Sequence, residues 1–563
     1  MPHVKARHAS RRASTGLEKL EHRDASAGPR HAAHLVESAR NVGQVAHPEG
    51  DRDGIETPVR KWNRFRASLA EAEGAARHLT IELSPGDIEH ASRRVQSHHH
   101  HAGRDAQDLA GAIAHLSRAE RPAVITLPAP LARPAALVEI ARERPAILWQ
   151  TPYGSALAGI GAACRIEGRG AGAIHAVRET AGGWCARLLR LAPPDMPSLP
   201  PRFFGGLSFD PQAPRDDAWR EFPDALFVLP RWTYERDGSR AFLRLALAGS
   251  PSRRAGDYLE EFEALAHALE LDPDPPVLDT GEIQVTEPDP DAWRAHVART
   301  RDAIREGRFR KVVAARASVV ESERDMDPFA LISRVAAEHV GSTAFAIAPG
   351  DGATFLGATP ETLISVSGLR VASDPLAGSI ALPDAAGGAA ERERRAAALL
   401  ASRKDAAEHA LVVESVTALL RPLVHALDFP GTPRIRADRH VMHLHTPIRG
   451  ELLAARHVLE LVAALHPTPS VGGVPTSDAL DWIRRFEPGS RGWYAGPVGW
   501  FDTAGNGEFA IAIRCGLVDG TTALVHAGAG IVADSDPAAE YEETVVKQRP
   551  FLRALGIAVP VAS

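Results

Sequence analysis

The feature that most constrains this chain is a change of hydrophobic pattern near residue 120. Residues 1–60 mix Arg, His, Ala and Gly without sustained apolar periodicity, whereas short apolar runs, helical stretches and Gly/Pro turns alternate after residue 120. A segment of the first kind cannot bury much apolar surface. We therefore predict a largely disordered N-terminal extension over residues 1–118 and one folded domain over residues 119–563.

The apolar runs after residue 120 have the length and flanking turns of strands. The predicted strands, two of which form a hairpin, are residues 121–129, 145–151, 224–238 and 240–249. Residues 258–271 are predicted as an amphipathic helix. Gly159 and Gly161 imitate a dinucleotide-binding motif, but Cys164 replaces its third glycine, which favours a turn between strands. Strands and helices do not alternate strictly, so the pattern predicts an α+β fold.

Charge and histidine are unevenly distributed. The chain has 65 Lys/Arg and 71 Asp/Glu, a formal charge of −6, which argues against nucleic acid as its partner. Residues 1–118 hold 18 basic and 15 acidic side chains and 13 of the 25 histidines. The run His98–His101 can bind a transition metal only where a fold positions the rings, so a loop is the preferred interpretation. The first 17 residues resemble either an organellar transit peptide or a dispensable leader.

Cysteine content and hydropathy limit the compartment. Cys164, Cys185 and Cys515 form no CxxC pair, so neither a disulfide framework nor a cysteine zinc site is predicted, and the compartment is expected to be reducing. No apolar run reaches the roughly 18 residues of a membrane span, and no secretory signal is present. We expect a cytoplasmic protein.

Two residues in the C-terminal half are candidates for acid–base chemistry. Lys311 begins the apolar strand 310–317; it is either a solvated edge residue or a buried amine that can take a proton from water. Glu361 follows a Gly/Pro turn beside apolar neighbours. It is either a carboxylate at a helix start or a carboxyl group that stays protonated and acts as a general acid.

A helix is predicted to begin at Ser402, which is followed by Asp405 in a capping pattern. On this helix, Glu408 shares one stripe with Val412, Ser415, Val416 and Leu419. Glu408 is therefore expected to face inward, where a carboxylate needs an Arg, a Lys or a metal ion as its partner.

A second helix is predicted to begin at Asp536, with Pro537 at its first position. Glu540, Glu543 and Lys547 then fall on one face at i, i+3 and i+7. This face is either exposed and salt-bridged, or it supplies two acids for a hard divalent cation and a lysine for a substrate carboxylate.

Three more segments can contact an anionic ligand. Gly378 lies in the turn 374–379, where its missing side chain lets backbone amides approach a ligand. Residues 508–515 alternate like one strand, with Phe509, Ile511 and Ile513 on one face and Arg514 on the other, where it can clamp a carboxylate. The small residues of 527–532 again expose backbone.

Taken in order, these segments resemble the chorismate-utilising enzymes, most closely isochorismate synthases. The resemblance covers about residues 120–563 and rests on the motifs KVVAAR, FLGATPETL, DPLAGS, SRKDAAEHALVVE, HLHTPIRGEL, LHPTPSVGGVP, RGWYAGPVGW, GNGEFAIAIRC, HAGAGIV and SDPAAEYEETVVK.

This resemblance implies two antiparallel sheets enclosed by helices, chorismate as substrate and a bound Mg²⁺. It implies Lys311 as the base that activates water and Glu361 as the acid that protonates the departing hydroxyl. The implied metal ligands are Glu408 and Glu543, with Glu540 holding a metal-bound water. The implied substrate-binding residues are Gly378, Ser379, His466, Arg514, Gly528 and Lys547.

Sister enzymes differ at two positions. Anthranilate synthases carry glutamine where Lys311 stands, and aminodeoxychorismate synthases carry a lysine where Ala377 stands, so no glutamine amidotransferase partner is expected. A monomer is expected. The alternatives are a salicylate synthase that also eliminates pyruvate and, more remotely, metal or nucleic-acid binding through the His/Arg-rich tail. The residues leave open whether the product serves menaquinone or a siderophore.

Deletion of residues 1–60 should leave kcat/KM for chorismate unaltered, because the predicted catalytic residues all follow residue 300. The full and shortened chains can be compared by initial rates at several chorismate concentrations. A large loss in the shortened chain would show that the extension takes part in catalysis.

Overall fold

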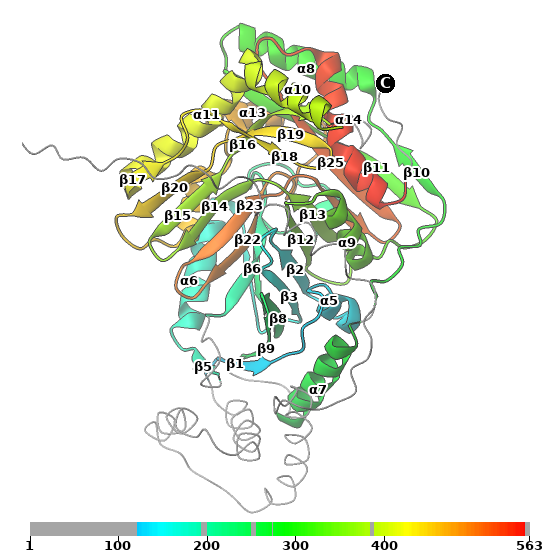
Figure 1. Ribbon diagram of the computed structural model, residues 1–563, viewed down its shortest axis with the longest axis vertical. Coiled ribbons are helices and arrows are strands. Elements are labelled where there is room, and N and C mark those ends of the chain that lie inside the picture. The colour runs from blue at the N-terminus through cyan, green and yellow to red at the C-terminus, as the bar shows by residue number, and fades with distance from the viewer. Residues whose placement is uncertain (1–120, 193–199, 249–254, 273, 383–387, 558–563) are drawn as a thin grey trace, which may run out of the picture. The chain divides into compact units, whose positions relative to one another are not determined.

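The computed structural model describes residues 121–192, 200–248, 255–272, 274–382 and 388–557 (Figure 1). The predicted extension over residues 1–118 and its run His98–His101 lie outside these ranges, so both predictions stay open. Among the described residues, no helix is both long enough and apolar enough to cross a bilayer.

Within the described ranges, the strands form two main sheets and a small third one. The larger main sheet has 13 strands there, and nearly all neighbouring pairs in it are antiparallel. Its strands in spatial order are β10 (Ile283–Thr286), β11 (Lys311–Ser322), β25 (Thr522–Ile531), β24 (Cys515–Asp519), β13 (Thr354–Thr359), β12 (Thr343–Ala348), β2 (Ala146–Gln150), β3 (Ala156–Ile160), β8 (Trp232–Asp237), β9 (Arg240–Leu247), β1 (Ala123–Pro128) and β5 (Leu189–Leu191), with β21 (Gly473–Val474) beside β11.

The second main sheet has nine strands, and a small third sheet has three. In spatial order the nine are β17 (Val424–Asp428), β20 (Ile448–Leu452), β15 (Arg370–Asp374), β14 (Thr362–Ser367), β23 (Gly507–Ile511), β22 (Pro497–Asp502), β6 (Arg202–Leu207), β7 (Ala225–Leu229) and β4 (Cys164–Gly168). The three are β16 (Leu376–Ala381), β19 (Val441–His445) and β18 (Arg434–Ala437).

Helices pack against these sheets (Figure 1). They are α5 (Ala136–Ala141), α6 (Ala173–Cys185), α7 (Ala255–Leu271), α8 (Pro290–Arg305), α9 (Pro328–Glu338), α10 (Gly388–Ala401), α11 (Arg403–Leu420), α12 (Val458–Leu465), α13 (Thr476–Phe486) and α14 (Pro537–Ala554). The predicted α+β fold, with two main antiparallel sheets and surrounding helices, is confirmed. The third sheet and the parallel pairing of β1 with β5 were not predicted.

The larger sheet is apolar on both faces, because each face has its own core. Along β2, Trp149 belongs to the core shared with the nine-stranded sheet, and its neighbour Leu148 belongs to the core on the opposite face. In the first core, the rings of Phe203 and Phe501 stack with their centroids 5.2 Å apart. In the second, helices such as α9 contribute side chains like Phe329. The strands therefore read as continuous apolar runs.

Most of the local predictions hold. The four predicted strand segments contain β1, β2, β7 with β8, and β9, and the predicted helix 258–271 lies within α7. The turn expected between Gly159 and Cys164 joins β3 to β4. The sequence did not show that β7 and β8, which are separated only by Pro230 and Arg231, belong to different sheets.

The prediction of one strand over residues 508–515 is wrong. Strand β23 ends at Ile511 in the nine-stranded sheet, and β24 begins at Cys515 in the larger sheet. The chain crosses between the sheets in a tight turn, in which the amide of Ile513 donates to the carbonyl of Ile511 at 2.8 Å and Arg514 has a φ of 55°. The residues on both sides of this turn alternate with period two, as in a strand. The local sequence therefore does not show where the chain passes from one sheet to the other.

Candidate active site

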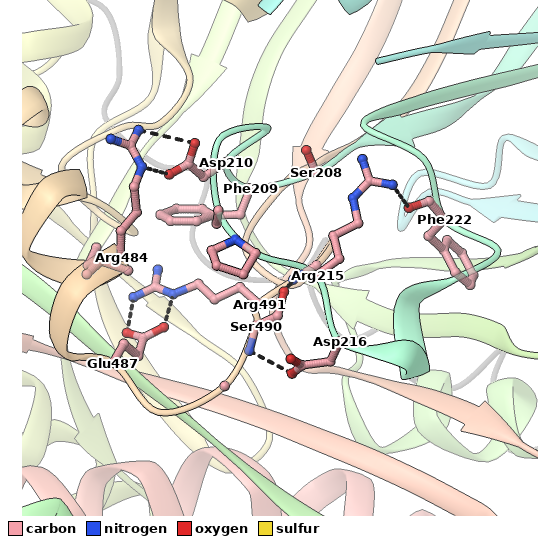
Figure 2. Close-up of a pocket in the computed structure, with 15 residues that line it drawn as sticks. Ser208, Phe209, Asp210, Arg215, Asp216, Phe222, Arg484, Glu487, Ser490 and Arg491 are labelled. Atoms are coloured by element: carbon pink, nitrogen blue, oxygen red, sulfur yellow. Dashed lines mark hydrogen bonds and ion pairs between the residues drawn. The ribbon is translucent and has the colours of Figure 1, made fainter. Parts of the chain in front are cut away.

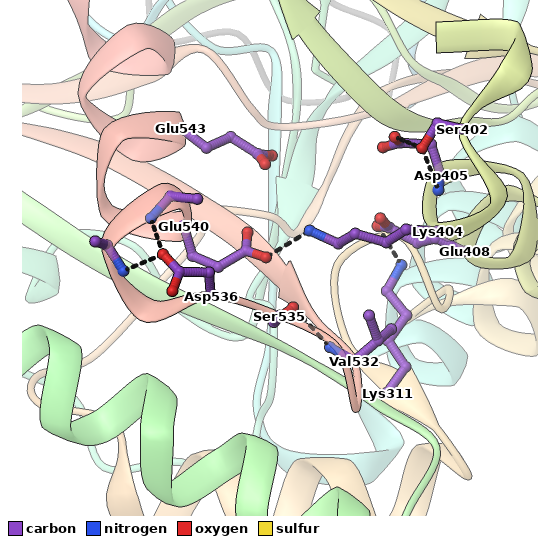
Figure 3. Close-up of polar contacts among 12 residues, drawn as sticks. Lys311, Ser402, Lys404, Asp405, Glu408, Val532, Ser535, Asp536, Glu540 and Glu543 are labelled. Atoms are coloured by element: carbon purple, nitrogen blue, oxygen red, sulfur yellow. Dashed lines mark hydrogen bonds and ion pairs between the residues drawn. The ribbon is translucent and has the colours of Figure 1, made fainter. Parts of the chain in front are cut away.

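The candidate site forms where β11 and β25 pair and two helices meet them. Helix α14 packs on β25, and α11 packs on β16 of the small sheet. Ser402 caps α11 by accepting from the amide of Asp405 at 3.2 Å, and Asp536 caps α14, with Pro537 at its first position. Both helix starts are as predicted. Figure 3 shows the acidic side chains of α11 and α14 extending into the same region as Lys311.

Lys311 is fully buried at the start of β11, so it is not a solvated edge residue. Its Nζ donates to Oε1 of Glu408 on α11 at 2.8 Å (Figure 3). Glu408 thus faces inward as predicted, although Ser415, assigned to the same stripe, is exposed. Gly530 of β25 makes room for this ion pair: a Cβ there would overlap the Glu408 carboxylate and lie 3.2 Å from Cε of Lys311. The sequence analysis did not single out Gly530.

Two further lysine–glutamate pairs complete the cluster. Nζ of Lys404 lies 2.6 Å from Oε1 of Glu540, and Nζ of Lys547 lies 2.6 Å from Oε1 of Glu543. Lys547 also donates to the carbonyl of Gly528 at 2.8 Å. Glu540 is only 1% exposed, so the predicted alternative of an exposed salt-bridged face on α14 is wrong. The sequence analysis missed Lys404, although it precedes Glu408 by one helical turn.

Glu540 and Glu543 of α14 differ electrostatically. Burial and then repulsion from Glu543 raise the pKa of Glu540 above its usual range. Burial also acts to raise the pKa of Glu543, but the ammonium of Lys547 and other cations outweigh it and lower that pKa. Glu543 is therefore the more readily ionised member of the pair.

Glu361 lies between β13 and β14, not at a helix start, and it is buried. The hydroxyl of Ser470 donates to its Oε1 at 2.7 Å, and Thr468 is hydrogen-bonded to Ser470 at 2.6 Å. Burial raises the pKa of Glu361 to about 7, against the opposing effects of Ser470 and Lys311. A substantial fraction of the carboxyl groups, about half at pH 7, is thus protonated and able to act as a general acid.

Arg514 and Ser379 meet through His443, which the sequence analysis did not single out. An amine of the Arg514 guanidinium lies 3.2 Å from Nε2 of His443, and Oγ of Ser379 lies 3.1 Å from its Nδ1. Burial, with Arg514 and Lys547 nearby, holds the pKa of His443 well below its usual range, so the ring is neutral. It accepts from Arg514 and donates to Ser379, which fixes both side chains.

Gly378 occupies a bulge of β16 with a φ of 72°, a left-handed conformation that favours glycine. A Cβ there would lie 2.8 Å from Cβ of Asp405 on α11. The glycine therefore allows α11, which carries Glu408, to approach β16 closely.

His466 ends α12 and faces a different part of the molecule. Its Nε2 lies 3.0 Å from the carbonyl oxygen of Phe209, and burial lowers its pKa to about 4. Its Nδ1 has no hydrogen-bond partner within the described residues. The structure does not connect His466 to the lysine–glutamate cluster by any hydrogen bond that it describes.

A cavity of about 220 Å³ lies on the Phe209 side of the molecule, between the loop after β6 and the segment after α13 (Figure 2). None of the predicted site residues lines it. Arg491, one of its lining residues, is paired with Glu487 at 2.6 Å and donates to the carbonyl of Val313 at 2.7 Å. Glu487 accepts from the amide of Ala315 at 2.9 Å. These contacts hold the backbone of β11 in place at Val313 and Ala315, two and four residues after Lys311.

The comparisons with known proteins agree on one family. The model of the family described as chorismate binding enzyme matches residues 111–556. The chain belongs to the chorismate-binding enzyme family. This result confirms the resemblance, and with it the prediction of an enzyme, that the sequence motifs indicated.

Named relatives of this family cover most of the chain. It is 37% identical over 423 residues to the salicylate biosynthesis isochorismate synthase of Pseudomonas aeruginosa, covering 74% of this chain and 86% of that protein. It is 38% identical over 358 residues to isochorismate synthase MenF of Bacillus subtilis, covering 63% and 75%. The structure of MenF, the menaquinone-specific isochorismate synthase of Escherichia coli, aligns with a TM-score of 0.65 and 27% identity over 79% of this chain and 98% of that one.

Replacement of Glu361 by glutamine should stabilise the protein in a pH-dependent way. Below about pH 4.5 the carboxyl is protonated in both the folded and the unfolded chain, so the variant gains nothing. As pH rises toward 7 the unfolded chain ionises first, and the folded wild type loses roughly 3 kcal/mol that the amide does not lose. Thermal unfolding of both proteins across this range checks it, and a difference independent of pH contradicts the raised pKa.

Proposed function

We propose that this enzyme is a Mg²⁺-dependent isochorismate synthase, which adds water at C2 of chorismate and expels the C4 hydroxyl. The observation that carries the proposal is a buried lysine, Lys311, within electrostatic reach of a carboxyl group, Glu361, whose pKa is raised to about 7. One residue can take a proton and the other can give one. The family relatives that are named isochorismate synthases support the same reaction.

The proton transfers balance in this reaction. To act as the base, Lys311 must first lose the proton that it donates to Glu408. It then takes a proton from water as the oxygen bonds to C2, and the double bond shifts as the C4–O bond breaks. Glu361 gives its proton to the departing hydroxyl, which leaves as water. The hydroxyl of Ser470 donates to Oε1 of Glu361 and helps to hold this carboxyl group in place.

The substrate is a dianion, and the enzyme's body is itself acidic, so attraction to the substrate must be local. We assign the substrate carboxylates to Arg514 and Lys547. His443 holds the guanidinium of Arg514 in place, and the Gly528 carbonyl holds the ammonium of Lys547. Backbone near Gly378 and Ser379, together with His466, completes the substrate-binding set proposed from the sequence.

The residues fit a magnesium site in donor chemistry. Glu408 and Glu543 offer hard oxygen ligands from two helices, and Glu540 adds a buried carboxylate close enough to Glu543 to be repelled by it. No group of three His, Cys, Asp or Glu side chains within the described residues is arranged to hold a metal alone. A pair of carboxylates such as Glu408 and Glu543 suits Mg²⁺, which takes one or two carboxylates with water and substrate oxygens. Bound there, the ion neutralises charge on the substrate carboxylate.

The nucleophile distinguishes this proposal from the related amination. A general base is needed to activate water, whereas ammonia is already a nucleophile, so Lys311 supports hydroxylation at C2. For the pathway we favour menaquinone formation in the cytoplasm, on likeness to the Bacillus subtilis and Escherichia coli proteins.

Incubation with chorismate and Mg²⁺ should yield isochorismate, approaching a near-even equilibrium because one allylic alcohol replaces another. Chromatography separates isochorismate from salicylate with pyruvate and from anthranilate, and either of those as main product overturns the proposal. Lys311→Ala should lower kcat by about 10²- to 10⁴-fold. Arg310→Ala, an exposed neighbour, is the matched control and should keep normal turnover.

Glu543→Gln should raise the Mg²⁺ concentration needed for half-maximal activity by roughly tenfold or more, because an amide is a weaker ligand than a carboxylate. Glu542→Gln alters the adjacent exposed acid of α14 and should leave that concentration unchanged. An unaltered metal requirement in Glu543→Gln counts against the site between the two helices.

A further inference from the structure

Lys404 has no role in the proposed reaction, yet it lies near the three carboxylates that are proposed to bind the metal or its water. It extends from α11 toward α14, where its ammonium pairs with Glu540 at 2.6 Å (Figure 3). Its ammonium is also attracted by the nearby carboxylates of Glu543 and Glu408. The ammonium therefore sits in the combined field of the three carboxylates that are proposed to bind the metal or its water.

Among the described contacts, Lys404 is also the only cation that pairs with the carboxylate of Glu540. Glu540 is 1% exposed, and a buried carboxylate without a cation is costly. Its other described polar partner is the neutral Ser535, and Glu543 repels it. Lys404 itself is 36% exposed, so its side chain can swing into water when Glu540 no longer needs it.

The three lysines and three glutamates balance in formal charge. A divalent cation entering alone leaves two positive charges uncompensated, whereas a cation entering with a dianionic substrate leaves the balance intact. Lys311 and Lys547 have proposed tasks once substrate is bound. Lys404 has none, and its ammonium would repel a cation placed between α11 and α14.

We infer that Lys404 is a built-in counter-cation, a positioning residue that holds Glu540 in the metal-free enzyme and competes with the divalent cation for the site. This inference rests on the proposed function and adds to it. It explains how the buried carboxylate of Glu540 is neutralised without metal. It also predicts that the chain weakens its own affinity for the metal in the absence of substrate.

The test is the dissociation constant for Mg²⁺ without chorismate, measured by calorimetry on the full chain. Lys404→Gln keeps a hydrogen-bond donor for Glu540 but removes the charge, so it should bind Mg²⁺ about tenfold more tightly than wild type. Lys404→Arg keeps the charge and should restore the wild-type constant. Arg403→Gln removes an exposed charge from the adjacent position and should change nothing.

The rise in Tm on adding Mg²⁺ is a second measurement, and a purely structural role of Lys404 would not change it. In EDTA, Lys404→Gln should unfold at a lower temperature than wild type, and Mg²⁺ should raise its Tm by more than it raises that of wild type. An equal or smaller rise, or a Mg²⁺ affinity equal to or weaker than wild type, overturns the inference.

The experiments distinguish a failure of the proposed reaction from a failure of the proposed role of Lys404. If wild type converts chorismate to isochorismate but Lys404→Gln binds Mg²⁺ no more tightly, the role of Lys404 is wrong and the proposed function stands. If wild type forms no isochorismate while Lys404→Gln still binds Mg²⁺ more tightly, the counter-cation stands and the reaction is wrong.

Discussion

An ammonium that water cannot reach needs a carboxylate within hydrogen-bonding distance, and Lys311 finds one in Glu408, 97 residues away on another element. This contact requires β11 and α11 to lie close together, which limits the size of the residues that can pack around it. Gly530 leaves the space that the two side chains fill, and Gly378 lets α11 approach the small sheet. Losing either partner would leave a buried charge uncompensated.

The same constraint organises the rest of the site. Glu408, Glu540 and Glu543 each have a lysine partner, and each lysine comes from a different element: β11, α11 or α14. The positive and negative groups are thus assembled before any ligand arrives. This preorganisation is what a site for a dianion and a divalent cation needs, since charges fixed in advance do not have to be reorganised during the reaction.

The protein scaffold supports this site from behind. Arg491 and Glu487, beyond the far end of α13, hydrogen-bond to the backbone of β11 at Val313 and Ala315. His466 and Phe209 pack edge to face, with ring centroids 5.8 Å apart, beside the cavity that Arg491 helps to line. The strand that presents Lys311 is therefore held on one side by β25 and on the other by β21, by β10 and by the ion pair between Arg491 and Glu487.

Much of the local structure followed from residue types and spacing. Ser402 and Asp536 marked two helix starts, period-two runs marked strands, and the order of the motifs indicated the family. The strand predicted through Arg514 was wrong because alternation continues across a change of sheet. Lys404 and His443 escaped notice because each is an ordinary polar residue until another element supplies Glu540 or Arg514 as its partner.

The sequence by itself determined which chemical groups the chain carries, in what order, and which family uses that order. Only the tertiary structure decided which lysine neutralises which glutamate and that the pKa of Glu361 is raised to about 7. The physical reason is that charge pairing and desolvation depend on distances between residues far apart in the chain, and those distances are set by how the sheets and helices pack.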